Sequence, residues 1–199
     1  MSGNIDWHEI NRKIFHILFG IIIALLVYYD AISAWGVLLF IGFGIIISIV
    51  STFYDIPVIT YFLNRFEREH LRKKFPGKGV IYFFLGLLFM MLTFEKSIVM
   101  AAIMIWIFGD SVSAIIGKNF GKIVHPLNYA RLIEGTIAGI IAASLAASLF
   151  VYWPYAIIGA TITLGIESIE WKLYRETFDD NFFVPVIGAA AIYLMTIIF

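Results

Sequence analysis

Seven apolar runs divide the chain, and short polar segments separate them. They cover residues 14–29, 34–53, 80–94, 97–108, 135–152, 155–169 and 182–199. A helix needs about 20 apolar residues to cross a bilayer. Several runs are shorter, so their helices must borrow flanking polar residues or thin the bilayer. The pattern predicts an all-α polytopic membrane bundle of about seven transmembrane helices.

The first run also has features of a signal peptide. Arg12 and Lys13 precede it, and the small residues Ala31 and Ser33 follow it, as they would around a cleavage site. We expect the run to be retained as the first span. Residues 1–199 then form a single transmembrane domain that carries the catalytic residues.

The segment between the second and third runs, residues 55–78, mixes aromatic and basic side chains. This pattern predicts an amphipathic helix on the cytoplasmic membrane surface, and such a helix could gate the entry of a lipid. The alternative is a solvated basic loop attracted to anionic lipid. The side chains concerned are Tyr61, Phe62, Phe66, Leu71 and Phe75 with Arg65, Arg68, Arg72, Lys73 and Lys74.

Composition supports an integral membrane protein and excludes several other classes. Hydrophobic residues make up 61% of the chain and charged residues 14%, and the mean hydropathy is +0.93. Basic and acidic residues number 14 each, so no charge excess points to a nucleic acid polymer as partner. The absence of cysteine excludes disulfides, thiolate metal sites and cysteine nucleophiles. No P-loop, dinucleotide-binding or H-E-x-x-H motif occurs.

The basic residues also predict the orientation in the membrane. If the N-terminus is cytoplasmic and seven spans alternate, every lysine and arginine except Lys96 falls on the cytoplasmic side. This is the bias of the positive-inside rule. The polar clusters then face the compartment that contains nucleotides.

A polar cluster follows the fourth run at residues 109–122 and resumes at residues 131–136. The Asp110 carboxylate could hold Mg²⁺, and Lys118, Lys122 and N–H groups at glycine turns could hold phosphate oxygens. Lys118 and Lys122 would point the same way if the helix continued between them. We interpret the cluster as the floor of a nucleotide-phosphate site. The alternative is a polar loop with snorkelling lysines.

Other ionisable groups stand at the ends of apolar runs. Glu134 precedes the fifth run, and Glu167 lies in the last turns of the sixth, on one helical face with Glu170. Asp179, Asp180 and Asn181 precede the seventh run; a helix N-cap explains one aspartate, and a metal or catalytic role is expected for another. His16 shares a helical face with Arg12. Ionisable groups at membrane depth are functional by default.

Two glycines of the fifth run have a structural interpretation. Gly135 and Gly139 are four residues apart, and the Gly-x-x-x-Gly spacing is typical of close helix packing in membranes. We therefore expect the fifth helix to approach a neighbouring helix closely along this face.

Five blocks together resemble the dolichol kinase and phytol kinase family, which includes CTP-dependent diacylglycerol kinase. They are Arg12-Lys13-x-x-His16; Gly77-x-Gly79; Gly109-Asp110-x-x-x-Ala114-x-x-x-Gly117-x-x-x-Gly121-Lys122; Glu134-Gly135-Thr136; and Glu167 with Asp179-Asp180-Asn181-x-x-x-Pro185. Arg131 stands where the family usually has lysine. The central block also resembles phosphatidate cytidylyltransferases, but their C-terminal His-Gly-Gly and Asp-Arg-x-Asp endings are missing.

The resemblance implies transfer of the γ-phosphoryl group of CTP to a membrane isoprenoid alcohol of the dolichol or polyprenol kind, with Mg²⁺ as cofactor. Asp110, Glu134, Glu167 and Asp180 would be catalytic, with Asp110 and Asp180 as metal ligands. The residues expected to bind the nucleotide are Arg12, Lys13, His16, Gly109, Ser111, Gly117, Lys118, Gly121, Lys122, Arg131, Gly135, Thr136 and Asn181.

Two other functions remain open on the sequence. A cytidylyltransferase would make a CDP-activated lipid and release pyrophosphate. A non-enzymatic lipid transporter would use Asp110 and Glu134 to line a path. The partners expected for the kinase are CTP and a lipid alcohol, and the sequence leaves a homodimer open.

Overall fold

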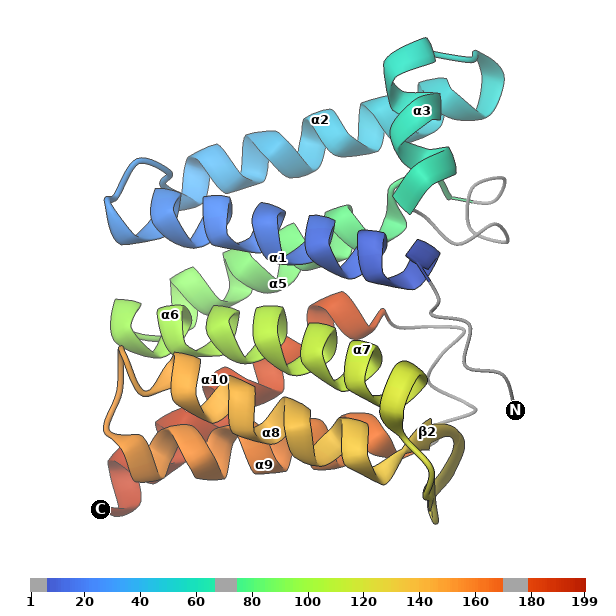
Figure 1. The fold of residues 1–199 in the computed structure, drawn as a ribbon. Helices are drawn as coiled ribbons and strands as arrows, with labels where there is room; N and C mark the ends of the chain where they lie inside the picture. Colours follow the sequence, from blue (N-terminus) through green and yellow to red (C-terminus); the bar gives the residue numbers. More distant parts are fainter. Residues whose placement is uncertain (1–6, 67–74, 170–178) are drawn as a thin grey trace.

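The computed structural model describes residues 7–66, 75–169 and 179–199. Long helices run back and forth between two ends of a bundle, with a short hairpin at one end (Figure 1). The helices are α1 (Trp7–Tyr28), α2 (Ala34–Phe53), α3 (Pro57–Phe66), α5 (Lys78–Thr93), α6 (Lys96–Met104), the π-helical η1 (Ile105–Gly109), α7 (Asp110–Phe120), α8 (Ile133–Ala147), α9 (Trp153–Ser168) and α10 (Asp180–Ile198). The all-α membrane bundle predicted from the sequence is confirmed, and each predicted apolar run coincides with a helix, although α8 ends at Ala147, before the end of the run predicted over residues 135–152.

Four stretches of the described chain are long and apolar enough to cross a membrane. They are Glu9–Tyr28, Ala34–Phe53, Lys96–Phe120 and Asp180–Ile198, and the shorter apolar helices Lys78–Thr93 and Ile133–Ala147 accompany them. The start of α1 and the end of α10 lie at opposite ends of the bundle (Figure 1). This arrangement agrees with an odd number of crossings.

The core of the bundle is the helix formed by α6 and η1. All residues of α6 from Ile98 onwards are buried, and so are Ile105, Trp106 and Ile107 of η1. The reason is that α1, α5, α8 and α10 all pack around α6. By contrast, α2 exposes most of its apolar side chains, including Leu39, Phe43 and Ile46. Outward-facing apolar side chains of this kind meet lipid in a membrane bundle.

Close packing of α7 against α8 depends on glycine. A Cβ atom at Gly135 would lie 2.4 Å from the carbonyl oxygen of Ser113 and 2.8 Å from Cα of Gly117. A Cβ atom at Gly139 would lie 2.8 Å from the carbonyl oxygen of Gly109. The two backbones are therefore in direct contact, and the packing role predicted for Gly135 and Gly139 is confirmed.

Residues 109–120 are helical, which corrects the expectation of glycine turns in this cluster. The helix continues from η1 through α7 to Phe120, and Gly117 is buried inside it against α8. Gly121 is extended, with φ −70° and ψ 146°, so Lys122 lies beyond the helix and does not share a helical face with Lys118. The helix continues because its glycines and serines pack on α8, a tertiary contact that composition does not reveal.

A hairpin and a short helix flank the bundle at this end. Strand β1 (Val124–His125) pairs antiparallel with β2 (Asn128–Leu132), where the sequence suggested only a polar gap. Helix α3 lies within the amphipathic segment predicted over residues 55–78, and α5 begins at Lys78. Its Phe66 stacks on Phe15 of α1 with ring centroids 4.2 Å apart. Residues 67–74 of that segment lie outside the described residues.

Candidate functional site

Helix α1 begins and helices α7 and α9 end at the same end of the bundle (Figure 1), and charged side chains from five elements meet there. Ion pairs or electrostatic interactions join each of them to another member. We call them the charge cluster: Glu9, Arg12, Lys13, His16, Asp110, Lys118, Arg131, Glu167 and Asp180.

A buried ion pair between α1 and α7 forms the centre of the charge cluster. Lys13 Nζ lies 2.5 Å from Asp110 Oδ2, and the Lys13 side chain is only 4% exposed. His16 Nε2 lies 3.8 Å from the same oxygen. Lys13 and His16 are three residues apart on α1, so both face α7. A cation that binds Asp110 would therefore compete with Lys13 for this carboxylate.

A second buried pair joins the hairpin to α9. Arg131 Nη2 lies 2.5 Å from Glu167 Oε1, and the Glu167 side chain is 6% exposed. Burial works against the charge of Arg131, but Glu167, Asp110 and Asp180 together outweigh it and raise the pKa of the guanidinium. Asp110 and Asp180 also lie close enough to interact electrostatically with both residues.

The second oxygen of Glu167 lacks a partner in the described part of the chain. Oε2 is buried and makes no hydrogen bond there, and the same is true of Ser111 Oγ and His16 Nε2. An unsatisfied buried acceptor is costly. Oε2 is therefore suited to a bound cation or to a hydroxyl group that donates to it.

The outer part of the charge cluster contains Glu9, which sequence reasoning missed. Its carboxylate lies 2.5 Å from Arg12 Nη2 and 3.0 Å from Lys118 Nζ. The contact with Lys118 joins α1 to α7 across more than 100 positions of the chain. The sequence showed only that Glu9 stands four residues before Lys13 near the start of the chain.

The Glu134 carboxylate accepts hydrogen bonds from backbone N–H groups. Its Oε1 accepts hydrogen bonds from the N–H groups of Lys122 and Ile123 at 2.9 Å and 3.1 Å. It thereby fixes the chain between α7 and the hairpin, and the catalytic role expected of Glu134 stays a prediction. The neighbouring Thr136 joins α8 to α9, with Oγ1 3.1 Å from Ser168 Oγ.

Asn181 is held in place by residues from two elements. Asp179 caps α10 and accepts from the backbone N–H and the Nδ2 of Asn181, which confirms the predicted N-cap. Trp106 Nε1 donates to Asn181 Oδ1 at 3.3 Å, and its ring lies 4.0 Å from that of His16 between centroids. Burial raises the pKa of Asp179, and Asp180 adds to the effect. Lys78 Nζ lies 3.9 Å from Asp179.

Trp106 and Lys78 were not expected at the site. The signals available were a lone tryptophan four residues before Asp110 and a lysine between Gly77 and Gly79. A π-helical turn at Ile105–Gly109, which carries Trp106, was not visible in the sequence; such turns often occur at functional sites. Glu170, expected to share a face with Glu167, lies outside the described residues.

The oxygen ligands of the charge cluster fit Mg²⁺ only in part. No group of three or more His, Cys, Asp or Glu residues in the described ranges could hold a metal ion. Asp110, Glu167 and Ser111 nevertheless offer hard oxygen atoms, two of them unpartnered and buried. Mg²⁺ is usually bound by one or two carboxylates together with waters and substrate phosphates. A site completed by phosphates is compatible with these residues.

Comparisons with known proteins give relatives but no solved template. No family model matches the chain, and no solved structure matches it. The chain is 33% identical to the uncharacterized protein MJ1137 of Methanocaldococcus jannaschii over 184 residues, or 91% of each chain. It is 23% identical to CTP-dependent diacylglycerol kinase 1 of Saccharomyces cerevisiae, over 92% of this chain and 71% of that protein. It is also 23% identical to the protein of the same name from Schizosaccharomyces pombe, over 98% of this chain and 100% of that protein.

Proposed function

The chain belongs to the family of the Methanocaldococcus jannaschii protein, and because it is also similar to two CTP-dependent diacylglycerol kinases we propose that it is a CTP-dependent lipid kinase. One structural observation carries the proposal. Lys13, Asp110, Arg131 and Glu167 converge at one end of a membrane bundle, and one buried carboxylate oxygen among them has no partner in the described residues. Phosphoryl transfer needs this combination of cations and carboxylates.

The proposed reaction joins the hydroxyl oxygen of the lipid to the γ-phosphorus of CTP. The bond from that phosphorus to the oxygen bridging it to the β-phosphate breaks, and CDP leaves with the bonding electrons. Glu167 Oε2 accepts the hydroxyl proton, and its neighbour Arg131 holds the carboxylate in place. Lys13 and Arg131, with Arg12 and Lys118 at the edge, bind phosphate oxygens and neutralise their charge.

Asp110 and Asp180 are the residues that would hold Mg²⁺. When bound, Mg²⁺ would neutralise charge on the phosphates that it contacts. Asp110 is paired with Lys13, so a metal held by Asp110 would leave the Lys13 ammonium group to bind a phosphate. Asp179 and Trp106 fix the position of the Asn181 side chain. Asn181 would in turn orient Asp180.

We propose an isoprenoid alcohol of the dolichol or polyprenol kind as the acceptor. This choice rests on the motifs that the chain has in common with dolichol and phytol kinases. Diacylglycerol is the second candidate, because the names of the two kinases specify it. Both present one hydroxyl group at the membrane surface, so the charge cluster serves either acceptor.

Purified protein in lipid vesicles tests the proposal directly. CTP labelled at the γ-phosphate or, in a parallel reaction, at the α-phosphate is offered with Mg²⁺ and a panel of polyprenols, dolichol, phytol and diacylglycerol. The kinase transfers the γ label to the lipid and releases CDP. Transfer of an α label, with release of pyrophosphate, would instead establish a cytidylyltransferase. A protein that binds no CTP at all would support the lipid-transporter alternative.

A further inference from the structure

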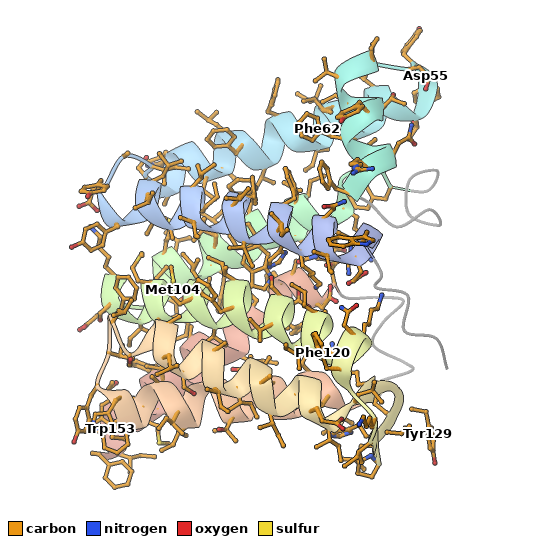
Figure 2. The ribbon with its side chains drawn as sticks, viewed as in Figure 1. Asp55, Phe62, Met104, Phe120, Tyr129 and Trp153 are labelled. Carbon is orange, nitrogen blue, oxygen red and sulfur yellow. The ribbon has the colours of Figure 1, made fainter. Side chains whose placement is uncertain are left out.

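Large apolar side chains are exposed around the hairpin at the charged end of the bundle. They range from 48% exposed at Val124 to 83% at Tyr129. We call them the hairpin patch: Phe120, Ile123, Val124, Leu127 and Tyr129. The hairpin extends beyond the end of α7, beside the start of α8 (Figure 1), and Tyr129 points away from the bundle (Figure 2). Contiguous exposed apolar surface of this kind marks a contact with a membrane or a protein.

The hairpin patch continues a face of the bundle that meets lipid. Ile137, Ile141 and Leu145 are exposed at intervals of four residues, so they line one face of α8. Strand β2 passes directly into α8, and the apolar surface therefore extends past the start of that helix onto the hairpin. We propose that the hairpin patch inserts into the interfacial layer of the bilayer at the end of the bundle that holds the charge cluster.

The distribution of side chains favours lipid over a protein partner. Val124 lies in β1, Leu127 in the turn and Tyr129 in β2. All three are exposed, so the apolar side chains are spread over both strands and the turn. A docked protein would cover only part of such a ribbon, whereas lipid surrounds an inserted tip on all sides.

Polar residues of the hairpin also suit the membrane interface. Lys122 is exposed between Phe120 and Ile123 of the hairpin patch, where its charge would meet anionic headgroups. Tyrosine is enriched at the same depth, because it has an apolar ring and a polar hydroxyl. Arg131 follows Tyr129 by two residues, so insertion of the hairpin would fix Arg131 at the level of the lipid headgroups. The inference does not depend on the proposed function.

Spin labelling tests the insertion cleanly because the chain has no cysteine. Leu127→Cys and Val124→Cys each receive one nitroxide label in the full-length protein. The protein is reconstituted in vesicles of phosphatidylcholine and phosphatidylglycerol. Collision with oxygen, which concentrates in the acyl region, is compared with collision with a water-soluble nickel chelate. Ile141→Cys on the lipid face of α8 is the lipid control, and Asp55→Cys, whose side chain points away from the bundle (Figure 2), is the water control.

Insertion predicts that the labels at positions 127 and 124 collide with oxygen more than with nickel, as the label at position 141 does. Collision with nickel at the level of position 55 would overturn the proposal, since the hairpin patch would then be in water. Low collision with both reagents would also overturn it, because the labels would then be covered by protein, such as a second copy of this chain.

Discussion

At the scale of single residues, the pair of Lys13 and Asp110 connects stability with the proposed chemistry. Each charge is removed from water and is tolerable only beside the other. Both positions were singled out from the sequence, but their contact joins residues 97 positions apart. Local patterns identify such groups because charges are rare in apolar runs. They do not identify the partner, which depends on how α1 packs on α7.

A single and a double variant separate the structural role of this pair from its role in phosphoryl transfer. Asp110→Asn leaves Lys13 buried without a counter-charge, so we expect a loss of about 3–5 kcal/mol in stability and no measurable turnover. The double variant Lys13→Met with Asp110→Asn has no stranded charge. It should recover most of the thermal unfolding midpoint in detergent but none of the turnover. A double variant with most of the normal turnover would show that the pair is only structural.

Arg131 provides a second residue-scale prediction. Arg131→Ala removes a cation from the charge cluster and leaves Glu167 unpaired, so CTP affinity or turnover should fall at least tenfold, equivalent to about 1.4 kcal/mol. Arg131→Lys keeps the positive charge, with the residue that the resemblance to dolichol and phytol kinases leads us to expect there, and should recover much of the loss.

The matched control for Arg131 is Lys96 at the opposite end of the bundle. Lys96 forms an exposed pair with Asp30 at 2.7 Å, and exposed pairs contribute little. Lys96→Ala should leave both CTP affinity and turnover nearly unchanged at constant ionic strength. Equal losses for the two alanine variants would reduce the role of Arg131 to diffuse electrostatics.

At the scale of elements, hydropathy predicted the helices well because each apolar run must satisfy its own backbone in lipid. It failed at residues 109–122, where polar composition suggested turns and the structure has a helix followed by a hairpin. Glycine explains the failure. Gly117 suggested a turn, but it lies inside α7, where α8 packs so closely that a Cβ atom at Gly135 would lie 2.8 Å from Cα of Gly117.

The α7–α8 contact predicts a strong asymmetry between two glycine substitutions. Gly135→Ala places Cβ against the backbone of α7, so it should force the helices apart and destabilise the protein by about 1–3 kcal/mol. Gly165→Ala meets no atom within 4 Å and should be neutral or stabilise α9 by up to about 1 kcal/mol. Thermal unfolding of both variants in the same detergent provides the comparison. An unaffected midpoint for Gly135→Ala, with CTP binding lost, would instead indicate contact of Gly135 with the nucleotide.

At the scale of the whole molecule, the charges divide between the two ends of the bundle. Arg12, Lys13, Lys78, Lys118 and Arg131 lie where α1 begins, and Lys96 lies at the other end with Asp30. This division was predictable from the sequence, because alternating seven spans from one end of the bundle to the other assigns each basic residue to an end. The grouping of five elements into one charge cluster was not predictable, since it requires the order in which helices pack around α6.

The positive-inside rule converts this division into an orientation that labelling can measure. Asp55 and Glu95 are both exposed and stand at opposite ends of the bundle, near the start of α3 and of α6. In the chain without native cysteine, a membrane-impermeant maleimide added to intact cells should react with Glu95→Cys and spare Asp55→Cys. Asp55→Cys should react only after the membrane is opened. A reporter fused after Phe199 should read as external. The reverse labelling would place the charge cluster outside, away from cytoplasmic CTP, and the kinase proposal would then lack its phosphoryl donor.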